Sequence, residues 1–422
     1  MDEPTMDRAA LLSWATLHAG GRVVSTPDYG MSLSSKLLRF RWNDAPTVAV
    51  GAAPSVGKTR INAVLDAMAM VLAEPTAAST VNLILGLGPD EPQLKEHLGA
   101  ISTLVAGVTD GPEVKVWTLT AGQDPVEVST SPPQFTTGTP QRWAKLLTAA
   151  AQAPVEGMAA TIVGALAGRP SFALYPKLTS LASSRPWQMR LDGLEIGRAG
   201  RTSATLQLAS NDLTRPNEPR TTWLKTVGPV PRTFAADEVD DLIVLVDSLI
   251  ASWTHPSQPT AVLAHGQAEH ALEAHILSAR TALRTESGPL RLAVPFRSGT
   301  LGAAQFPTLW GDVTRPARYL DALLADDSSR PWAVELKDQD AGGGHGAYLR
   351  HGIGQAVLYR HYIRSASQLD EWFSSYGLQR TQCQAALAFP TASPGASATV
   401  TRLRDLAKLF DVEVIEFPRP GS

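Results

Sequence analysis

The stretch RYLDALLADDSSRPWAVELK (residues 318–337) contains two short apolar runs, and each run carries an acidic residue in its middle. Asp321 lies among leucines in the first run, and Glu335 lies in the second with Lys337 two positions later. The polar residues between the runs are typical of a turn, so the stretch predicts a β-hairpin. Because side chains alternate faces along a strand, we expect Asp321 and Glu335 to lie near each other on adjacent strands, with Lys337 on the same side.

Two neighbouring carboxylates repel each other unless a cation or a proton lies between them. Magnesium is a hard cation that binds one or two carboxylates together with water and phosphate oxygens. Lys337 would stand beside such an ion, where it could orient or deprotonate a water and offset charge on a phosphate. The alternative is an amphipathic hairpin with solvated charges. The apolar residues that bracket each charge favour an interior position, where unpaired carboxylates are costly.

The segments around the hairpin alternate between helical and strand-like patterns. Helical periodicity marks residues 268–283, 352–366 and 399–410, and apolar strand-like runs mark residues 383–389 and 412–417. This order predicts a mixed sheet flanked by helices. The helix after the hairpin places Gln355 and Tyr359 four residues apart on one face, and the helix before it places Glu269 and Glu273 at the same spacing.

Residues 262–417 resemble the PD-(D/E)XK phosphodiesterase superfamily, which has the restriction-endonuclease-like fold. The resemblance rests on Asp321, the triplet from Glu335 to Lys337, an upstream helical glutamate, and the helix with Gln355 and Tyr359. Leu320 stands where the family motif has proline.

The resemblance implies an endonuclease that uses Mg²⁺, or Mn²⁺ as a substitute, to hydrolyse DNA, with RNA not excluded. It implies that Asp321 and Glu335 hold the metal and that Lys337 is the catalytic lysine. Glu273 would complete the site through a water, and Gln355 and Tyr359 would point toward it. The alternative is a nucleotide-binding or nucleic-acid-binding regulator whose nuclease fold is inactive.

Residues 1–255 form a region of a different pattern. Apolar runs at 46–52, 80–87 and 114–119 alternate with helical patterns at 61–73 and 92–108, which predicts an α/β arrangement with parallel strands. Residues 187–210 alternate with glycine punctuation and predict a β-meander, followed by a helix near 235–253. Two prolines in residues 254–260 mark the boundary, so we expect domains at 1–255 and 261–422, with a sub-boundary near 129–140.

The run VAVGAAPSVGKTRINAVL (residues 48–65) approaches a phosphate-binding P-loop without matching it. The motif requires a glycine at the position of Ala52, and Gly51 lies one residue too early. We therefore expect no nucleotide cofactor at residues 51–59. The alternative is a helix start capped by Ser55, although Lys58 at such a helix end would favour some anion.

Composition restricts the class of protein. The chain has 422 residues, 44% hydrophobic and 18% charged, which indicates a folded protein of about two domains. Its net charge of −3 gives no overall basic field, so a contact with nucleic acid requires a local patch. Six arginines among residues 274–320 are candidates, although scattered solvated arginines explain them equally well.

The remaining expectations concern location and partners. The single cysteine, Cys383, excludes an intrachain disulfide and fits a reducing compartment. No apolar run approaches the ~20 residues that span a bilayer, so we expect a cytoplasmic protein that does not associate with a membrane. Cutting both DNA strands with one site per chain would require a homodimer or a partner protein. By analogy with other nucleases that carry a large extra region, we expect a role in genome defence.

Overall fold

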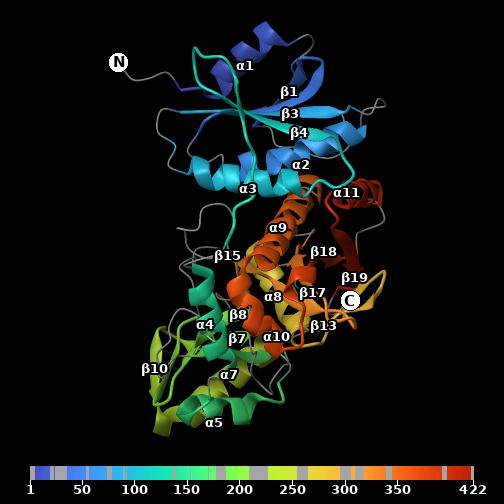
Figure 1. Cartoon of the computed structure of the whole chain (residues 1–422). Coiled ribbons are helices and arrows are strands. Elements are labelled where there is room, and N and C mark those ends of the chain that lie inside the picture. The colour runs from blue at the N-terminus through green and yellow to red at the C-terminus, as the bar shows by residue number, and fades with distance from the viewer. Residues whose placement is uncertain are drawn as a thin grey trace.

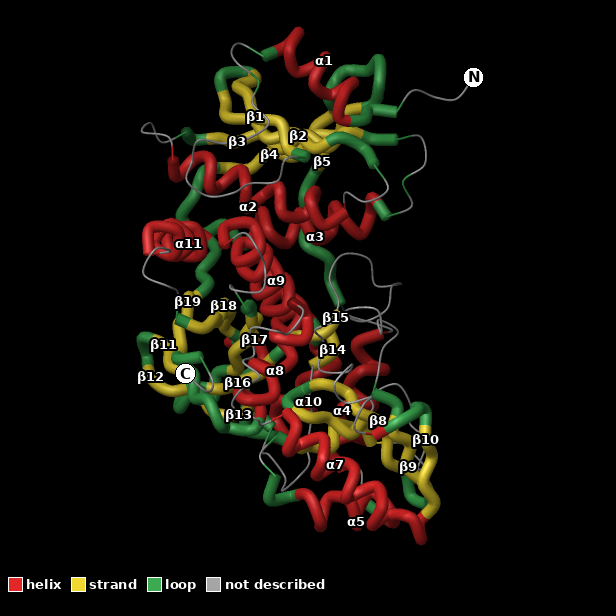
Figure 2. The backbone as a smooth tube through the Cα atoms, turned by 180° about the vertical axis from the view of Figure 1, so that it is seen from behind, coloured by secondary structure: helices red, strands yellow, loops and turns green. Residues whose placement is uncertain are grey.

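A computed structural model of the chain shows two α/β units on either side of a long central helix, with a β-meander at one end (Figures 1 and 2). The structure describes residues 5–19, 23, 36–53, 57–73, 78–88, 91, 93–135, 139–152, 154–169, 171–176, 187–208, 227–253, 265–294, 306–308, 318–338, 345–391 and 397–419. Ser55, the candidate helix cap, lies outside these residues.

The first unit is a five-stranded sheet in the order β1-β2-β3-β4-β5. The three central strands are parallel, as their continuous apolar runs predict, and the two edge strands are antiparallel. Helices α2 and α3 cover one face, and α1 covers the other (Figure 1). The elements are α1(Arg8–His18), β1(Leu37–Trp42), β2(Ala45–Val50), α2(Gly57–Ala73), β3(Thr80–Gly86), α3(Leu94–Ala106), β4(Glu113–Leu119) and β5(Val126–Val128).

The β-meander is a second five-stranded sheet, antiparallel throughout, in the order β10-β9-β8-β7-β6. Asp192 and Gly193 join two of its strands with φ angles of 42° and 77°, the left-handed conformation of a two-residue hairpin turn. Helices α5 and α7 pack on it around their own hydrophobic core. The elements are α4(Thr139–Gln152), α5(Gly157–Leu166), β6(Phe172–Pro176), β7(Trp187–Leu191), β8(Leu194–Ala199), β9(Ser203–Leu206), β10(Arg232–Ala235), η1(Ala236–Glu238) and α7(Val239–Trp253).

The last third contains a mixed sheet in the order β13-β16-β17-β18-β19. Its first three strands are antiparallel and its last three are parallel. The elements are α8(His265–Leu277), β11(Arg284–Thr285), β12(Gly288–Pro289), β13(Arg291–Leu292), β14(Phe306–Thr308), β15(Arg318–Leu320), β16(Ala322–Ala325), β17(Pro331–Leu336), α9(His345–Ser365), η3(Ser367–Leu369), α10(Asp370–Ser375), η4(Arg380–Gln382), β18(Gln384–Pro390), α11(Ser397–Leu409) and β19(Glu413–Phe417).

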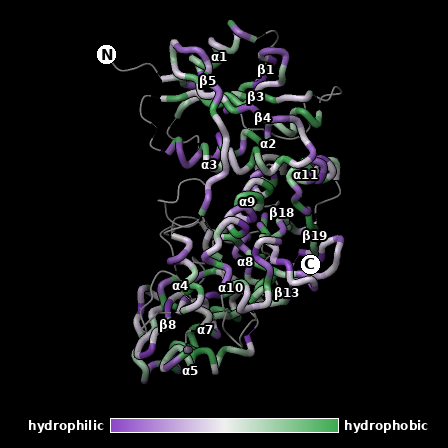
Figure 3. The backbone as a smooth tube through the Cα atoms, viewed as in Figure 1, coloured by the Kyte–Doolittle hydropathy of each residue, from purple (hydrophilic) through white to green (hydrophobic). Residues whose placement is uncertain are grey.

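Alternation along these strands divides the apolar side chains between two cores. Leu323 and Ala333 contribute to the core that contains α9 and α11, whereas Leu324 and Val334 contribute to the core that contains α8. Hydrophobic segments recur along α9 and β18 in the middle of the molecule (Figure 3). The expected α/β fold, with mixed sheets flanked by helices, is therefore confirmed, while the domain division at residues 255–261 stays a prediction.

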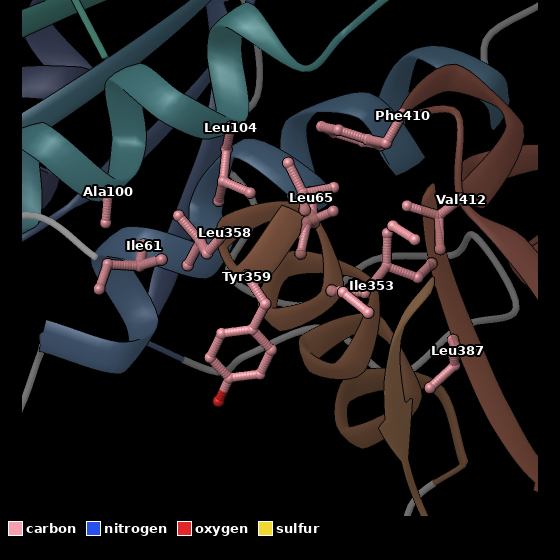
Figure 4. Close-up of a cluster of buried hydrophobic side chains, with 14 of the residues drawn as sticks. Ile61, Leu65, Ala100, Leu104, Ile353, Leu358, Tyr359, Leu387, Phe410 and Val412 are labelled. Atoms are coloured by element: carbon pink, nitrogen blue, oxygen red, sulfur yellow. The ribbon is translucent and has the colours of Figure 1, made fainter. Parts of the chain in front are cut away.

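Helix α9 packs between the mixed sheet and the helices of the first unit (Figure 4). Glycine allows α9 to pack closely against α2, because a Cβ at Gly354 would lie 3.0 Å from Leu65 of α2. A buried ion pair joins Arg350 of α9 to Asp66 of α2 at 2.8 Å. Burial raises the pKa of Asp66, and the Arg350 charge opposes that effect. The first unit and the last third thus share one continuous core.

Within the described residues, no helix is both long enough and apolar enough to cross a membrane.

Candidate functional site

The hairpin of residues 318–337 brings its two carboxylates together. Asp321 lies at the bend between β15 and β16, so the first run is an interrupted strand rather than the continuous one that we expected. Ala322 pairs with Val334 in the antiparallel register, which places Asp321 opposite Glu335. Asp321 Oδ2 accepts a hydrogen bond from the backbone N–H of Leu336 at 2.9 Å, which fixes the carboxylate against the neighbouring strand.

Lys337 lies beside these carboxylates and is only 3% exposed. Its Nζ lies 2.6 Å from Glu335 Oε1 and 3.2 Å from Glu269 Oε1, and it donates to the carbonyl oxygen of Leu336 at 3.1 Å. The ammonium also lies 5.3 Å from the centre of the Tyr348 ring. A lysine with this many partners is held in one position rather than sampling solvent.

Burial shapes the electrostatics of the three groups. Desolvation, opposed by the charge of Lys337, raises the pKa of Asp321 to about 6. Burial, and then the neighbouring charge of Asp321, raises the pKa of Glu335 well above its ordinary value. Burial opposes the charge on Lys337, but Glu335, Asp321 and Glu269 outweigh it and raise the pKa of the ammonium. The site therefore has more negative charge than one lysine neutralises.

Helix α8 adds three polar residues, one of which the sequence analysis missed. Glu269 reaches Lys337, as described above, whereas Glu273 accepts a hydrogen bond from His270 Nδ1 at 3.1 Å. Glu273 is 1% exposed, and its charge contributes to the raised pKa of Asp321. Burial opposes protonation of His270, but the hydrogen bond to Glu273 outweighs it and raises the pKa of the imidazole. The only signal for His270 was its place between two glutamates one helical turn apart.

Helix α9 carries Gln355 and Tyr359, and their orientation toward the carboxylates stays a prediction. Gly352 of this helix faces the lysine, because a Cβ there would lie 3.1 Å from Lys337 Cγ. Gln355 and Tyr359 follow Gly352 by three and seven residues and share its face. Gln355 Nε2 lies 3.3 Å from Tyr359 Oη, and the Tyr359 ring points away from α2 and α3 (Figure 4). Gln355 is half-buried and Tyr359 is buried.

Lys58 approaches the site from the first unit. It lies one turn before Asn62 on α2, and Asn62 Oδ1 contacts His351 Nδ1 of α9 at 3.0 Å, next to Gly352. Desolvation, and then the positive charge of Lys337, lowers the pKa of Lys58, while Glu269 and Glu335 oppose that effect. Lys58 remains exposed and, within the described chain, makes no hydrogen bond or ion pair. The lysine of the near P-loop therefore lies close enough to Glu269 and Glu335 for their charges to act on it.

The donor set suits a hard divalent cation. Asp321 and Glu335 supply carboxylate oxygens, the ligand type that Mg²⁺ prefers, and Glu335 Oε2 is buried without a hydrogen-bond partner in the described chain. Across the described residues, no three or more His, Cys, Asp or Glu side chains are arranged as a ready metal-binding group. Lys337 Nζ is instead the cation that now lies against Glu335. Asp321 and Glu335 thus offer the ligand type that such a metal prefers, while the lysine neutralises part of their charge.

Comparison of the chain with protein-family models, with curated proteins and with solved structures finds no match.

Proposed function

We propose that the chain is a Mg²⁺-dependent nuclease of the PD-(D/E)XK type that hydrolyses phosphodiester bonds in DNA. One observation carries the proposal: Asp321 and Glu335 meet across adjacent strands with Lys337 on the same face, and the two carboxylates have raised pKa values. Neighbouring carboxylates with raised pKa values destabilise the folded state when they are ionised, and such groups are typical of functional sites. The order of the mixed sheet, with helices on both faces, supports the same assignment.

The roles follow from the contacts of each residue. Asp321 and Glu335 would hold the metal, with Glu273 nearby, and Mn²⁺ could substitute for Mg²⁺. The metal, when bound, would activate a water and offset charge on the phosphate. Lys337 has three N–H donors, so its Nζ can hold a water or a phosphate oxygen once it leaves Glu335. As an ammonium with a raised pKa, it would orient the attacking water and offset charge on the phosphate rather than accept a proton.

The helices support these groups. Gln355 Oε1 is buried and accepts no hydrogen bond in the described part of the chain, so it is available to a water or to the Lys337 ammonium. Tyr359 holds the other end of that amide and acts as a positioning residue. Lys58 brings a second positive charge to the edge of the site, where it would pair with a phosphate of the DNA backbone.

A nuclease with a large additional region suits genome defence in the cytoplasm, through restriction or cleavage of phage DNA. Cutting of both strands would require a second copy of the chain or a partner protein. RNA is an alternative substrate.

The test is cleavage of supercoiled plasmid, linear DNA and RNA by the full chain in Mg²⁺, Mn²⁺, Ca²⁺ or EDTA. We expect Mg²⁺-dependent nicking that Asp321→Asn abolishes. Asp327→Asn, which changes an exposed acid in the turn of the same hairpin, is the matched control and should cleave normally. Cleavage that persists in Asp321→Asn would place the activity elsewhere.

The second candidate is a DNA-binding regulator with an inactive nuclease fold. The contact of 2.6 Å between Lys337 and Glu335 favours it, because the lysine already neutralises one carboxylate. DNA binding without cleavage in every metal would support this candidate.

A further inference from the structure

A cavity of about 110 Å³ lies between the β-meander and α8. Its wall includes Ser171, Tyr175 and Arg190 from the meander side, and Ser278 and Arg280 from the end of α8. None of these residues belongs to the proposed nuclease site. The exposed side chain of Arg169 also lines the cavity, which places one side of it at the surface.

Several polar atoms of this wall lack a partner. Arg190 Nη2 donates to Gln188 Oε1 at 3.1 Å, and the guanidinium lies 4.4 Å from the centre of the Tyr175 ring. Arg190 Nε and Nη1 are buried and donate no hydrogen bond within the described residues. The same holds for Ser171 Oγ and Tyr175 Oη, whose residues are 5% and 2% exposed. A buried donor without an acceptor lowers the stability of the folded state. Several such donors around one cavity therefore indicate that a ligand supplies the acceptor.

The charges of the wall indicate the sign of that acceptor. The lining includes three arginines and no acidic residue. Arg169 pairs with Asp247 at 2.8 Å, and Arg280 pairs with Asp192 at 2.7 Å. Arg190 makes no ion pair with any carboxylate in the described chain. Burial raises the pKa of Tyr175, so its hydroxyl stays protonated and can donate. The cavity therefore offers the guanidinium of Arg190 and neutral hydroxyl donors, although the charges of Glu273 and Asp192 also act on Tyr175.

Size restricts the ligand further. A water occupies about 30 Å³ of the liquid, so the cavity has room for one small tetrahedral ion, whereas organic ligands usually occupy pockets of about 300 Å³ or more. We propose that this cavity binds a phosphate group, through the guanidinium of Arg190 and the hydroxyls of Ser171 and Tyr175. The phosphate is either a free ion or the terminal monoester of a nucleic acid. Arginine forms charge-assisted hydrogen bonds with phosphate oxygens, which are stronger than those between neutral groups.

A bound phosphate would connect the meander to α8. The lining residue Ala274 lies on this helix directly after Glu273, and Ser278 follows the end of the helix at Leu277. On the meander side, Gly193 approaches α8 so closely that a Cβ there would lie 2.0 Å from the His270 carbonyl oxygen. Phosphate would thus stabilise the packing of the helix that carries Glu269 and Glu273.

The experiment measures binding of inorganic phosphate to the full chain by calorimetry and by thermal unfolding, in EDTA, with NaCl at matched ionic strength as the reference. We expect saturable binding and a midpoint that rises with phosphate concentration. Arg190→Gln should weaken phosphate binding at least about tenfold, since it removes charge-assisted hydrogen bonds. Arg198→Gln is the matched control, because Arg198 lies on the adjacent strand β8 and pairs with Glu195 at 3.3 Å; it should bind phosphate like the parent.

Two further variants keep the test decisive if Arg190→Gln does not fold. Arg190→Lys retains the charge and should keep partial binding, whereas Ser171→Ala removes one donor and should weaken binding severalfold without loss of the fold. The proposal would be overturned if the parent showed no saturable phosphate binding. It would also be overturned if Ser171→Ala and Arg190→Lys both bound phosphate as tightly as the parent does.

Oligonucleotides with and without a terminal phosphate distinguish the two sources. Competition with inorganic phosphate by the phosphorylated strand alone would assign the cavity to a nucleic-acid end, and competition by neither strand would assign it to free phosphate. None of these measurements requires cleavage, so the outcome is independent of the proposed nuclease activity.

Discussion

Asp321→Asn should make the metal-free chain more stable while it abolishes cleavage. The folded chain raises the pKa of Asp321 from its ordinary value of 3.8 to about 6, chiefly by desolvation. The folded state therefore binds this proton more tightly than the unfolded state does. The stability that protonation provides is present below about pH 4 and is lost as the pH rises through about 6. A difference of about two pKa units, at about 1.4 kcal/mol each, corresponds to about 3 kcal/mol.

Asparagine cannot ionise, and its side-chain oxygen can still accept the hydrogen bond from the Leu336 N–H. The variant should thus match the parent near pH 4 and exceed its free energy of unfolding by about 3 kcal/mol near pH 8. Urea unfolding in EDTA across this pH range measures the difference, with Asp327→Asn as the control for an exposed acid of the same hairpin. Adding Mg²⁺ should stabilise the parent alone and narrow the gap. A variant that is less stable at pH 8, or a difference that does not change with pH, would refute the reasoning.

Lys337→Ala should lower the cleavage rate by about 10² to 10⁴ while DNA affinity in Ca²⁺ changes little, because the lysine assists the chemical step; an unchanged rate in quench-flow assays would contradict that role. Lys58→Ala should reduce the salt dependence of DNA binding by about 0.9 in logarithmic slope for duplex or about 0.7 for single strands, whereas Lys95→Ala, an exposed lysine of α3, should leave the slope unchanged. Equal slopes for both variants would remove Lys58 from the site. Arg350→Met should destabilise the chain by about 3 to 5 kcal/mol in denaturant unfolding because it leaves Asp66 buried without its 2.8 Å partner, and adding Asp66→Leu should restore most of the loss. A double variant as unstable as the single one would show that the charge was not the cause.

The sheet and its central hairpin were predictable because their signals are local. Alternation over a few residues determines which side chains share a face, so the approach of Asp321 to Glu335 follows from the two runs and the turn between them. The same spacing rule placed Gln355 and Tyr359 on one face of α9. Only the break at Asp321 departed from the pattern, since the residues before it pair with β14 and those after it pair with β17.

Features that depend on contacts between distant segments were not predictable. Glu269 and Glu273 lie one helical turn apart on the same face of α8, so the sequence does not distinguish them. Their different partners, Lys337 and His270, become apparent only when α8 packs at the end of β17. The sequence around Lys58 predicted only that an anion would be favoured at the start of its own helix, because the glycine and lysine of this local motif carry no information about α9. Arg190 lies in an ordinary meander strand, and its unsatisfied donors become apparent only when α8 closes the cavity.

The packing of α9 against α2 has a consequence for synthesis of the chain on the ribosome. His351 contacts a residue of α2 that was translated 289 positions earlier. At a translation rate of about 5 to 20 residues per second, α9 is therefore synthesised roughly 15 to 60 s after α2. During that interval the α9-facing surface around Ile61 and Leu65 is open to water and to other nascent chains. Chaperones that shield apolar surface should thus bind this chain while it is being made, and slower translation of the meander should increase its aggregation.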